Sequence, residues 1–199
     1  MNKKIDNNGY VDLELPSGTL WATCNVGASK PSDFGQYFQW GDTKGYAKNQ
    51  VGKNKVFNWY YYKFGKLSNF TKYTKEGDTL VLEDDAANIN MKGDWHMPTP
   101  QQIRELIDNT ISTWTASNGV NGRLFTSKKD SSKSIFFPAS GFAYCGLIMK
   151  DTSYGIIWSN SLSTDIVSSG LCLAFDSNDA RLLSGYSRYY GFSIRGVIG

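Results

Sequence analysis

Residues 95–110, WHMPTPQQIRELIDNT, carry the clearest helix signal in the chain. Thr99 is a good N-cap, Pro100 suits the first helical position, and Gln102 completes a capping box with Thr99. An apolar stripe at helical spacing follows, made of Ile103, Leu106 and Ile107. This pattern predicts a helix over about 100–109. A shorter helix with acids in its first turn is predicted over LEDDAANIN, residues 82–90.

Outside these helices the sequence indicates short strands between turns. YVDLEL (10–15) alternates polar and apolar residues, PSGT (16–19) suits a turn, and LWATCNVG (20–27) suits a second strand, so we expect an opening hairpin. YFQWGD (37–42) is expected to be a short strand or a packed loop. Five further strand-like segments are GRLFTSK (122–128), SIFFPASGF (134–142), GIIWSNS (155–161), GLCLAFDS (170–177) and YGFSIRGVI (190–198). The sequence predicts one α+β domain over residues 1–199.

Aromatic residues are abundant, at 15 % of the chain. Residues 43–80 are poor in aliphatic side chains and are expected to form a long ordered loop, for which a functional and a packing role both stay open. The aromatic anchors of this loop are Phe57, Trp59, Tyr60 and Tyr61. The tryptophans in apolar contexts are Trp21, Trp40, Trp95 and Trp158. For these four we favour core packing, with sugar stacking as the alternative.

Charge and hydropathy argue against several classes of protein. The net charge is only +3 and the lysines are scattered, so no nucleic-acid-binding stripe is expected. The N-terminal lysines are not followed by an apolar stretch, so no signal peptide is predicted. No window approaches 18 apolar residues, so no membrane span is predicted either. The oligomeric state stays open.

Few residues suit catalysis or metal binding. The sole histidine, His96, is assigned a structural or solvent-facing role, and no glycine-rich phosphate loop is present. The acidic run Glu83–Asp85 lacks EF-hand spacing, so helix capping is favoured over calcium binding. The cysteines, which show no zinc or redox spacing, are Cys24, Cys145 and Cys172. We therefore expect no catalytic residue, no metal site and no cofactor, although a pair of distant carboxylates for glycoside cleavage stays open.

The last 49 residues, 151–199, avoid four residue types entirely. They contain no Lys, Glu, Gln or Met, whereas the first 150 residues contain 29 of these, so roughly nine would be expected in the tail. Within this tail the run LLSGYS (182–187) shows neither helical nor strand spacing. This composition raises the question whether the side chains of the tail belong to the buried core or form an exposed working surface.

Several stretches spread from about Tyr10 to Val197 form a specific combination: VDLELPSGTLWATCNVGA, YFQWGD, LEDDAA, WHMPTPQQIREL, FPASGF, IIWSNS and RYYGFSIRGV. Together they resemble the Fibrobacter succinogenes major paralogous domain family of Bacteroidetes. That family is similar to the formylglycine-generating-enzyme group of C-type lectin folds. The resemblance implies a C-type lectin-like fold, with paired terminal strands, two helices flanking a twisted, mostly antiparallel sheet, and long loops.

The resemblance also bears on activity. Formylglycine-generating enzymes use a cysteine pair that holds copper, and Cys172 has no second cysteine nearby, since Cys145 lies 27 residues upstream. An oxidase is therefore the least favoured alternative, because a fold alone confers no activity. Lectin-like domains of this kind also serve as variable proteins of diversity-generating retroelements. Adenine-directed mutagenesis of AAC codons in such genes leaves NNC codons, which cannot encode Lys, Glu, Gln, Met or Trp. The tail lacks the first four and has a single tryptophan, Trp158.

This resemblance implies a fixed framework and an exposed binding face within a variable-looking segment of about 143–190. The expected framework residues are Trp158, Ser159, Leu173, Phe175, Gly191, Phe192, Ile194 and Arg195. The expected ligand-binding residues are Tyr144, Ile157, Asn160, Asp165, Asp176, Leu182, Leu183, Tyr186 and Tyr189. The segment DARLLSGYSRYY (179–190) is expected to vary, with Leu182, Leu183, Tyr186 and Tyr189 exposed on one contiguous face.

The expected function is therefore non-enzymatic binding of a protein or glycan on a cell surface, with a phage tail or bacterial surface as the carrier. A non-diversified structural or adhesive domain from the same paralogous family is the alternative. The resemblance does not name the ligand.

Overall fold

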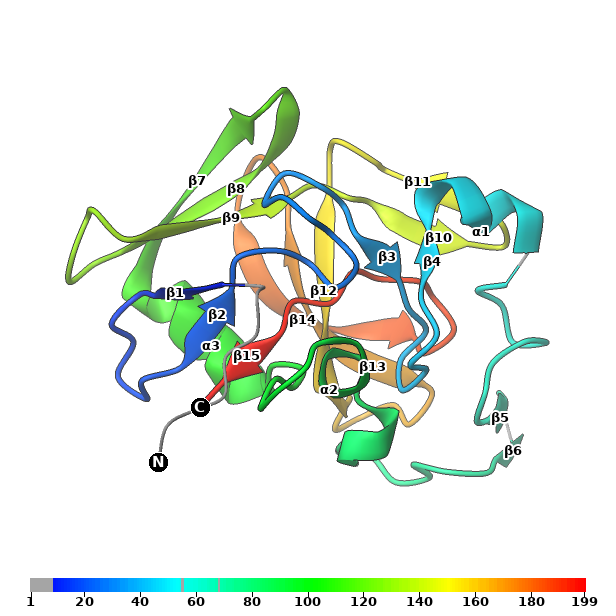
Figure 1. Ribbon diagram of the computed structural model, residues 1–199. Helices are drawn as coiled ribbons and strands as arrows, with labels where there is room; N and C mark the ends of the chain where they lie inside the picture. Colours follow the sequence, from blue (N-terminus) through cyan, green and yellow to red (C-terminus); the bar gives the residue numbers. More distant parts are fainter. Residues whose placement is uncertain (1–8, 55, 68) are drawn as a thin grey trace.

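The computed structural model describes residues 9–54, 56–67 and 69–199 of the chain, and Figure 1 shows their arrangement. The described residues form several small antiparallel sheets, three α-helices and one 3-10 turn. This arrangement confirms the predicted α+β class.

The two ends of the described chain meet in one small sheet. Strand β1 (Tyr10–Asp12) pairs antiparallel with β2 (Leu20–Ala22), which confirms the predicted opening hairpin in shorter form. On its other edge β2 pairs with β15 (Val197–Ile198), so the terminal strands are neighbours. The side chain of Trp21, opposite Val197, is fully buried.

The centre of the molecule is a three-stranded antiparallel sheet, β12 (Gly155–Leu162), β13 (Ser169–Phe175) and β14 (Ala180–Ser187). Both faces of this sheet are covered. Apolar residues on one face join a core with Ile103 and Leu106 of helix α3 (Pro100–Asn109), and those on the other join a second core around Trp40 and Phe192. A strand buried on two sides shows no simple alternation, because neither face needs polar residues.

Helix α3 begins where the sequence predicts. The Thr99 hydroxyl accepts the Gln102 N–H, and the Gln102 side chain accepts the Thr99 N–H, so the capping box is complete. The helix expected over 82–90 is interrupted instead. It consists of a 3-10 turn, η1 (Leu82–Asp84), and a short helix α2 (Ala86–Asn90), separated by Asp85, whose carboxylate caps α2 by accepting the Asn88 N–H.

A second three-stranded sheet consists of β7 (Thr110–Ser117), β8 (Val120–Ser127) and β9 (Ser134–Pro138). Strand β7 was not predicted, although Asn118 and Gly119 both have positive φ and form the two-residue turn that joins it to β8. Strand β10 (Phe142–Tyr144) then pairs with β11 (Leu147–Met149) in a hairpin beside helix α1 (Lys48–Asn54).

The prediction of one long loop over 43–80 was wrong in part. This segment contains β4 (Tyr46–Ala47), which pairs with β3 (Gln36–Tyr37), then α1, and then the hairpin of β5 (Gly65–Lys66) and β6 (Asn69–Phe70). These elements are two to seven residues long, which is below the length at which hydrophobic periodicity becomes readable.

The tail also differs from its expected layout. The run 182–187, which shows no strand spacing, is part of β14, whereas the predicted strand over 190–198 makes only isolated bridges before β15. Residues 191–198 of that segment are nevertheless buried, Phe192 and Ile194 included, and Tyr190 is half-buried. The core-packing interpretation of the tryptophans is confirmed, since Trp21, Trp40, Trp95 and Trp158 have no exposed surface.

Candidate functional site

Strand β14 explains where the tail side chains point. Leu182 lies opposite Leu173 and packs on the α3 side of the central sheet, whereas Leu183 lies opposite Cys172 and packs on the other side. A bulge follows, in which Ser184 and Gly185 together face one residue of β13. Because of this extra residue, Tyr186 returns to the same side as Leu183 and packs on the Trp40 core.

From that side a series of stacked rings leads to the surface. The Phe192 ring stacks on buried Trp158 with centroids 3.9 Å apart, and Tyr190 stacks on Phe192 at 6.0 Å. Tyr189 and Tyr144 both stack against Tyr190, with centroids 4.8 Å and 5.2 Å away. The outermost rings therefore pack on other rings, and this packing continues to the centre of the core. Such contacts hold the surface rings in fixed positions.

The β10–β11 hairpin brings Tyr144 to this surface. Cys145 and Gly146 both have positive φ and form its tight turn, and Ala143 exchanges two backbone hydrogen bonds with Gly191 at 2.8 Å and 2.9 Å. A side chain at position 191 would collide with the Phe57 ring, so the close approach requires glycine. Ala143 and Ile148 pack inward on the small core around Phe57.

The other face of this hairpin is apolar and open to solvent. Tyr144 is directly opposite Leu147, and Phe142 opposite Met149, so all four side chains share one face of the hairpin. Leu147 is 62 % exposed, Met149 39 % and Tyr144 37 %. We call the surface formed by Tyr144, Leu147, Met149, Tyr186, Tyr189 and Tyr190 the tyrosine face.

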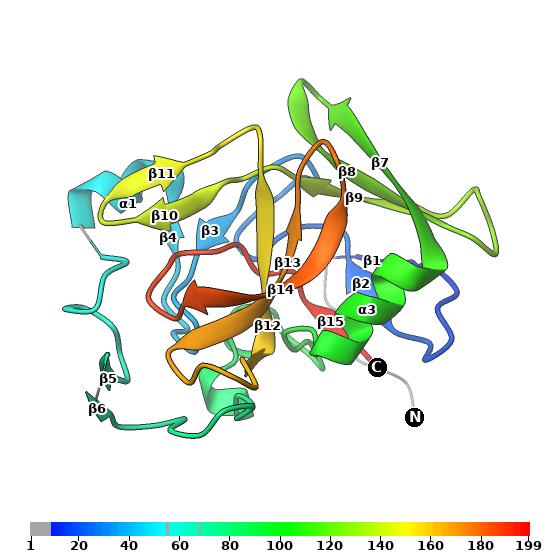
Figure 2. The same ribbon diagram turned by 180° about the vertical axis from the view of Figure 1, so that it is seen from behind.

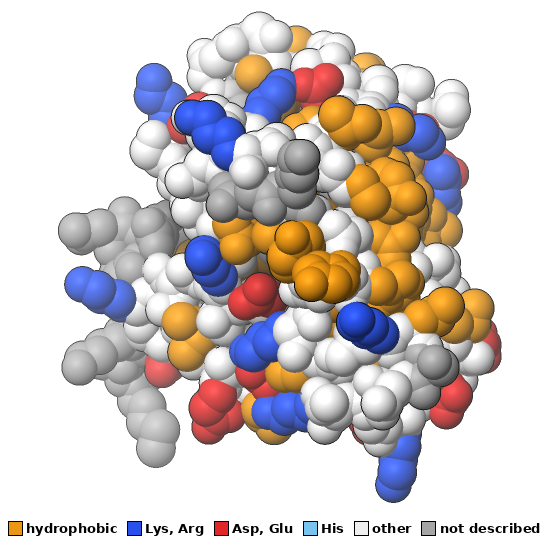
Figure 3. Space-filling model, turned by 90° about the vertical axis from the view of Figure 1, so that its right-hand side faces the viewer, with side chains coloured by type: hydrophobic (Ala, Val, Ile, Leu, Met, Phe, Trp, Pro, Cys, Tyr) orange, Lys and Arg blue, Asp and Glu red, His pale blue; other side chains and the backbone are white. Residues whose placement is uncertain are grey.

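Figure 3, which views the molecule from the side of the β10–β11 hairpin and α1, shows a continuous band of hydrophobic side chains with few charges in it. Burial raises the pKa of Tyr189, so its hydroxyl is neutral at physiological pH. The Tyr186 hydroxyl lies 3.1 Å from that of Tyr154. The tyrosine face thus offers flat aromatic and aliphatic contact area with neutral hydroxyl groups, a composition suited to equilibrium binding.

The sequence-predicted binding residues fall into separate groups. Tyr144, Tyr186 and Tyr189 lie together on the tyrosine face, and Tyr186 and Tyr189 are half-buried. Leu182 and Leu183 are also half-buried, on opposite sides of the sheet, so the expected single exposed face of four residues was wrong. The reason is the strand conformation of β14, in which successive side chains point to opposite faces.

Ile157 is not a surface residue. It lies opposite Leu173 in the α3-side core and has no exposed surface, so its expected place on the binding face was wrong. Its neighbour Trp158 points to the other core, and a strand with both faces covered has no outward position at either residue.

Three polar residues lie away from the tyrosine face. Asp176 begins the β13–β14 turn, where its carboxylate accepts the N–H groups of Asn178 and Asp179 and pairs with Arg181 at 3.5 Å. Asp165 is exposed in the β12–β13 turn, and Asn160 is half-buried near the end of β12. Asp176 therefore has a turn-forming role that the sequence did not indicate.

The expected framework residues are all buried. Among them Arg195 is the most constrained: its guanidinium donates to the carbonyls of Ala22, Thr23 and Phe136, and its Nε donates to Asn25. The segment 179–190, expected to vary as a whole, also contains a buried framework residue. Arg188 has no exposed surface.

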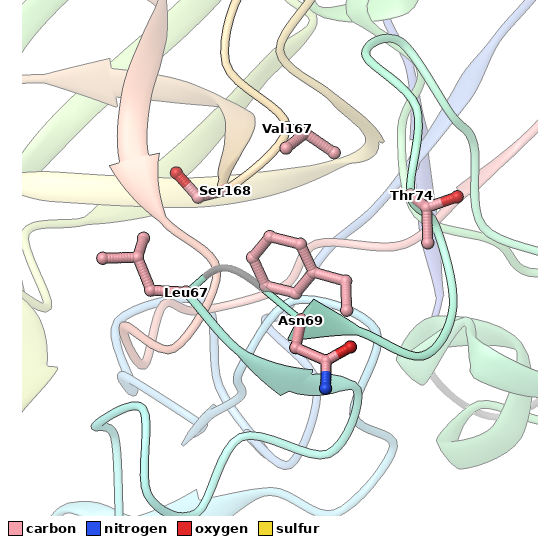
Figure 4. A pocket seen from close by; sticks show the side chains of 6 residues that line it. Leu67, Asn69, Thr74, Val167 and Ser168 are labelled. Atoms are coloured by element: carbon pink, nitrogen blue, oxygen red, sulfur yellow. The ribbon is translucent and has the colours of Figure 1, made fainter.

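Arg188 contacts Val167 and Phe70, two residues that line a hollow next to the tyrosine face. Its guanidinium donates to the carbonyls of Val167 and Tyr73 at 2.7 Å and 2.6 Å and lies 3.9 Å from the centre of the Phe70 ring. Figure 4 shows the hollow, about 390 Å³, between the β5–β6 hairpin and the β12–β13 turn. Trp59 contacts both Phe70 and Tyr189, so the rings of the hollow and of the tyrosine face are continuous.

Within the described residues the histidine and the cysteines do not form a shared cluster. His96 bridges to Val197 through its backbone, and its Nδ1 lies 2.9 Å from the Met97 carbonyl oxygen. Within the described residues no group of three or more His, Cys, Asp or Glu side chains is placed to hold a metal ion, and Cys24, Cys145 and Cys172 are free thiols. None of the helices in the described ranges has the length and apolar character of a membrane span.

Sequence reasoning missed four members of this surface and its surroundings: Trp59 as a contact of Tyr189, and Leu147, Met149 and Tyr190 on the tyrosine face itself. The signal for the hairpin is present in FAYCGLIM (142–149), where two short apolar runs are separated by two residues, the second of them a glycine.

No protein-family model, no curated protein and no solved structure matches this chain. The function is accordingly inferred from the geometry of the surface and from the sequence.

Proposed function

We propose that this protein is a non-enzymatic binding protein whose tyrosine face recognises a protein or glycan on a cell surface. The observation that carries the proposal is the stack of Tyr144, Tyr189 and Tyr190 on the buried Phe192–Trp158 pair. A rigid aromatic surface loses little conformational entropy on binding, and tyrosine combines large contact area with a hydrogen-bonding group. No bond is made or broken in such a mechanism.

The proposal includes the C-type lectin-like fold and retroelement diversification of the tail. The pairing of β15 with β2, which brings the terminal strands together, supports the fold. The absence of Lys, Glu, Gln and Met from residues 151–199 supports a restricted codon set, and exposed tail positions such as Ser184 are compatible with variation. Buried tail positions such as Arg188 and Arg195 would then be fixed. The carrier would be a phage tail or a bacterial surface.

Two measurements test the proposal. Fluorescently labelled protein is applied to a panel of bacterial cells and to a glycan array, in parallel with Tyr144→Ala and Tyr189→Ala variants. Truncation of an aromatic anchor at a binding surface is expected to weaken binding by about 2 kcal/mol, or roughly thirtyfold. Tyr10→Ala is the matched control, since Tyr10 is 42 % exposed on β1, away from the tyrosine face.

Retention of target binding by both tyrosine-face variants would contradict the proposed surface. Sequencing around the gene tests the diversification separately. A nearby reverse transcriptase and a near-identical repeat that differs at adenines are expected, and their absence would favour a non-diversified adhesive domain.

A further inference from the structure

A second hollow of about 290 Å³, with a mixed polar and apolar lining, lies between the start of α3, the end of β12 and the segment around Thr79. Thr79 forms an isolated bridge with Ser161, which brings the two non-helical walls together. This hollow is distinct from the one at Phe70, and none of the residues of the tyrosine face lines it. Asn160, which the sequence singled out as a binding residue, is part of its wall.

Both backbone groups of Asn160, its N–H and its carbonyl, are hydrogen-bonded. Its N–H donates to the Pro98 carbonyl and its carbonyl accepts the Leu80 N–H, each at 2.9 Å. In the side chain, Oδ1 accepts the Ser161 hydroxyl at 2.8 Å, which orients the amide. The Nδ2 group has no hydrogen-bond partner in the described part of the chain, so two oriented donor hydrogens are available at the wall of the hollow.

The charged member of the wall is Arg104 on α3. It is exposed, and it makes neither an ion pair nor a hydrogen bond with any residue that the structure describes. Gln101 lies three residues before Arg104 on α3. Its side-chain amide and the Thr79 hydroxyl likewise have no hydrogen-bond partner within the described ranges. Hydrogen-bonding side chains from three separate segments therefore line one hollow, and among them Arg104 carries donors alone.

None of the described residues that line the hollow carries a carboxylate. Three acids are next to lining residues in the sequence: Asp78 accepts the Lys75 N–H, Glu105 accepts the N–H and hydroxyl of Ser17, and Asp165 accepts the hydroxyl of the lining residue Thr164. The backbone at the start of α3 adds little, because Pro100 has no N–H and the Gln102 N–H is already bonded to Thr99. Recognition at this place therefore depends mainly on side chains, and Arg104 is the only charged residue among the described residues that line the hollow.

We propose that this hollow, the Arg104 pocket, binds the oxyanion group of a small hydroxylated ligand such as a sugar acid. A guanidinium forms paired, charge-assisted hydrogen bonds with carboxylate, sulfate or phosphate oxygens, and these are the strongest hydrogen bonds available to a surface site. The Asn160 and Gln101 amides and the Thr79 hydroxyl then bind neighbouring hydroxyl groups. The volume is at the lower end for ligand sites, which suits a single sugar ring.

The test uses the full chain and four probes: glucose, glucuronate, glucose 6-sulfate and glucose 6-phosphate. Binding is followed by chemical-shift changes of the backbone and side-chain amides of Asn160 and Gln101 during titration. At least one anionic probe is expected to bind at millimolar concentration, to shift these amides and to weaken as salt rises, whereas glucose does not bind. Comparison of the three anions shows which oxyanion is preferred.

Arg104→Gln is expected to weaken binding of the anionic probe about tenfold or more, and Asn160→Ala about threefold, because a charged hydrogen bond contributes more than a neutral one. Lys30→Gln is the matched control, since it removes one positive charge from an exposed side chain outside the pocket, and it should change the affinity less than twofold. Tyr144→Ala and Tyr189→Ala should leave it unchanged.

The proposal fails if none of the anions binds, if glucose binds as tightly as glucuronate, or if Arg104→Gln retains the affinity. It does not rest on the tyrosine face. Loss of cell binding in the tyrosine variants with intact anion binding, or the reverse, distinguishes the failure of one proposal from the failure of the other.

Discussion

Leu182 and Leu183 are adjacent in the chain but pack into different cores, one on the α3 side of the central sheet and one on the Trp40 side. Both are half-buried, and their cross-strand partners Leu173 and Cys172 are fully buried. Each leucine therefore contributes to the stability of the fold as well as to the surface next to it. Leu183 packs on the same core as Tyr186 of the tyrosine face, whereas Leu182 packs on the opposite side of the sheet.

Leu182→Ala and Leu183→Ala are each expected to lower the free energy of unfolding by about 1–2 kcal/mol, less than the loss at a fully buried leucine. Urea unfolding measures both. Ser184→Ala, at an exposed neighbouring position, serves as the control and should change stability by less than about 0.5 kcal/mol. A neutral effect of Leu182→Ala would contradict its place in the α3-side core. Target binding should survive Leu182→Ala.

The bulge in β14 predicts a special requirement at Gly185. Its φ is +103°, a conformation that side chains rarely adopt, while the space around it is open. Gly185→Ala is expected to destabilise the fold by about 1–2 kcal/mol through backbone strain alone. It should also disturb the environment of Tyr186, measured as a shift of its ring protons by NMR. Unchanged stability and an unchanged Tyr186 spectrum would show that the bulge does not depend on this glycine.

Arg188 is predicted to be indispensable despite its place in the variable-looking segment. Arg188→Met leaves the buried carbonyls of Val167 and Tyr73 without their donors and removes the guanidinium from the Phe70 ring, so a loss of about 3 kcal/mol or more is expected. Arg181→Met removes a partly exposed arginine paired with Asp176 and Asp179 and should cost less than about 1 kcal/mol. Thermal and urea unfolding compare the two. Equal effects would contradict the structural role of Arg188.

Asp84 is predicted to make stability depend on pH in the acid range. Burial alone would raise its pKa, but hydrogen bonds from Lys63, Lys72 and Tyr73 outweigh that effect and hold the pKa at about 2. A carboxyl with a depressed pKa stabilises the fold above its unfolded-state pKa of about 4, and this contribution is lost as the pH falls from about 4 to 2.

Asp84→Asn should therefore lower stability at pH 7 by about 1 kcal/mol, a small value because both lysine side chains are substantially exposed, and should flatten the acid dependence. Urea midpoints from pH 7 to pH 2 measure this. The exposed Asp94 provides the control through Asp94→Asn, which should leave the profile unchanged. An acid dependence as steep in Asp84→Asn as in the wild-type chain would refute the assignment.

Local signals made part of this fold predictable. Helix α3 was placed correctly because Thr99, Pro100 and Gln102 specify its start within four residues. Burial of Phe192, Ile194 and Trp158 was also expected correctly, since large apolar side chains recur in those segments. Strand β14 was missed because its bulge at Ser184–Gly185 breaks the period of two and because Leu182 and Leu183, on opposite faces, are both apolar and half-buried.

The candidate surface was predictable only in part, for a physical reason. Tyr144 and Tyr189 meet because Ala143 pairs with Gly191, a contact between residues 48 positions apart that no local pattern specifies. Arg188 and Tyr189 are consecutive, yet Arg188 is fully buried and Tyr189 only half-buried. Residue type alone would predict the tyrosine to be the more buried of the two.

The pairing of β2 with β15 has a consequence for how this molecule is attached to anything larger. Gly199 lies beside Thr19, and the views in Figures 1 and 2 place this small sheet at the opposite end of the molecule from the β10–β11 hairpin. A tether joined to the last residue would hold the domain by one end and leave the tyrosine face pointing outward. Fusions at that end should accordingly orient the protein on a bead, a chip or a particle without masking the surface that is to be tested.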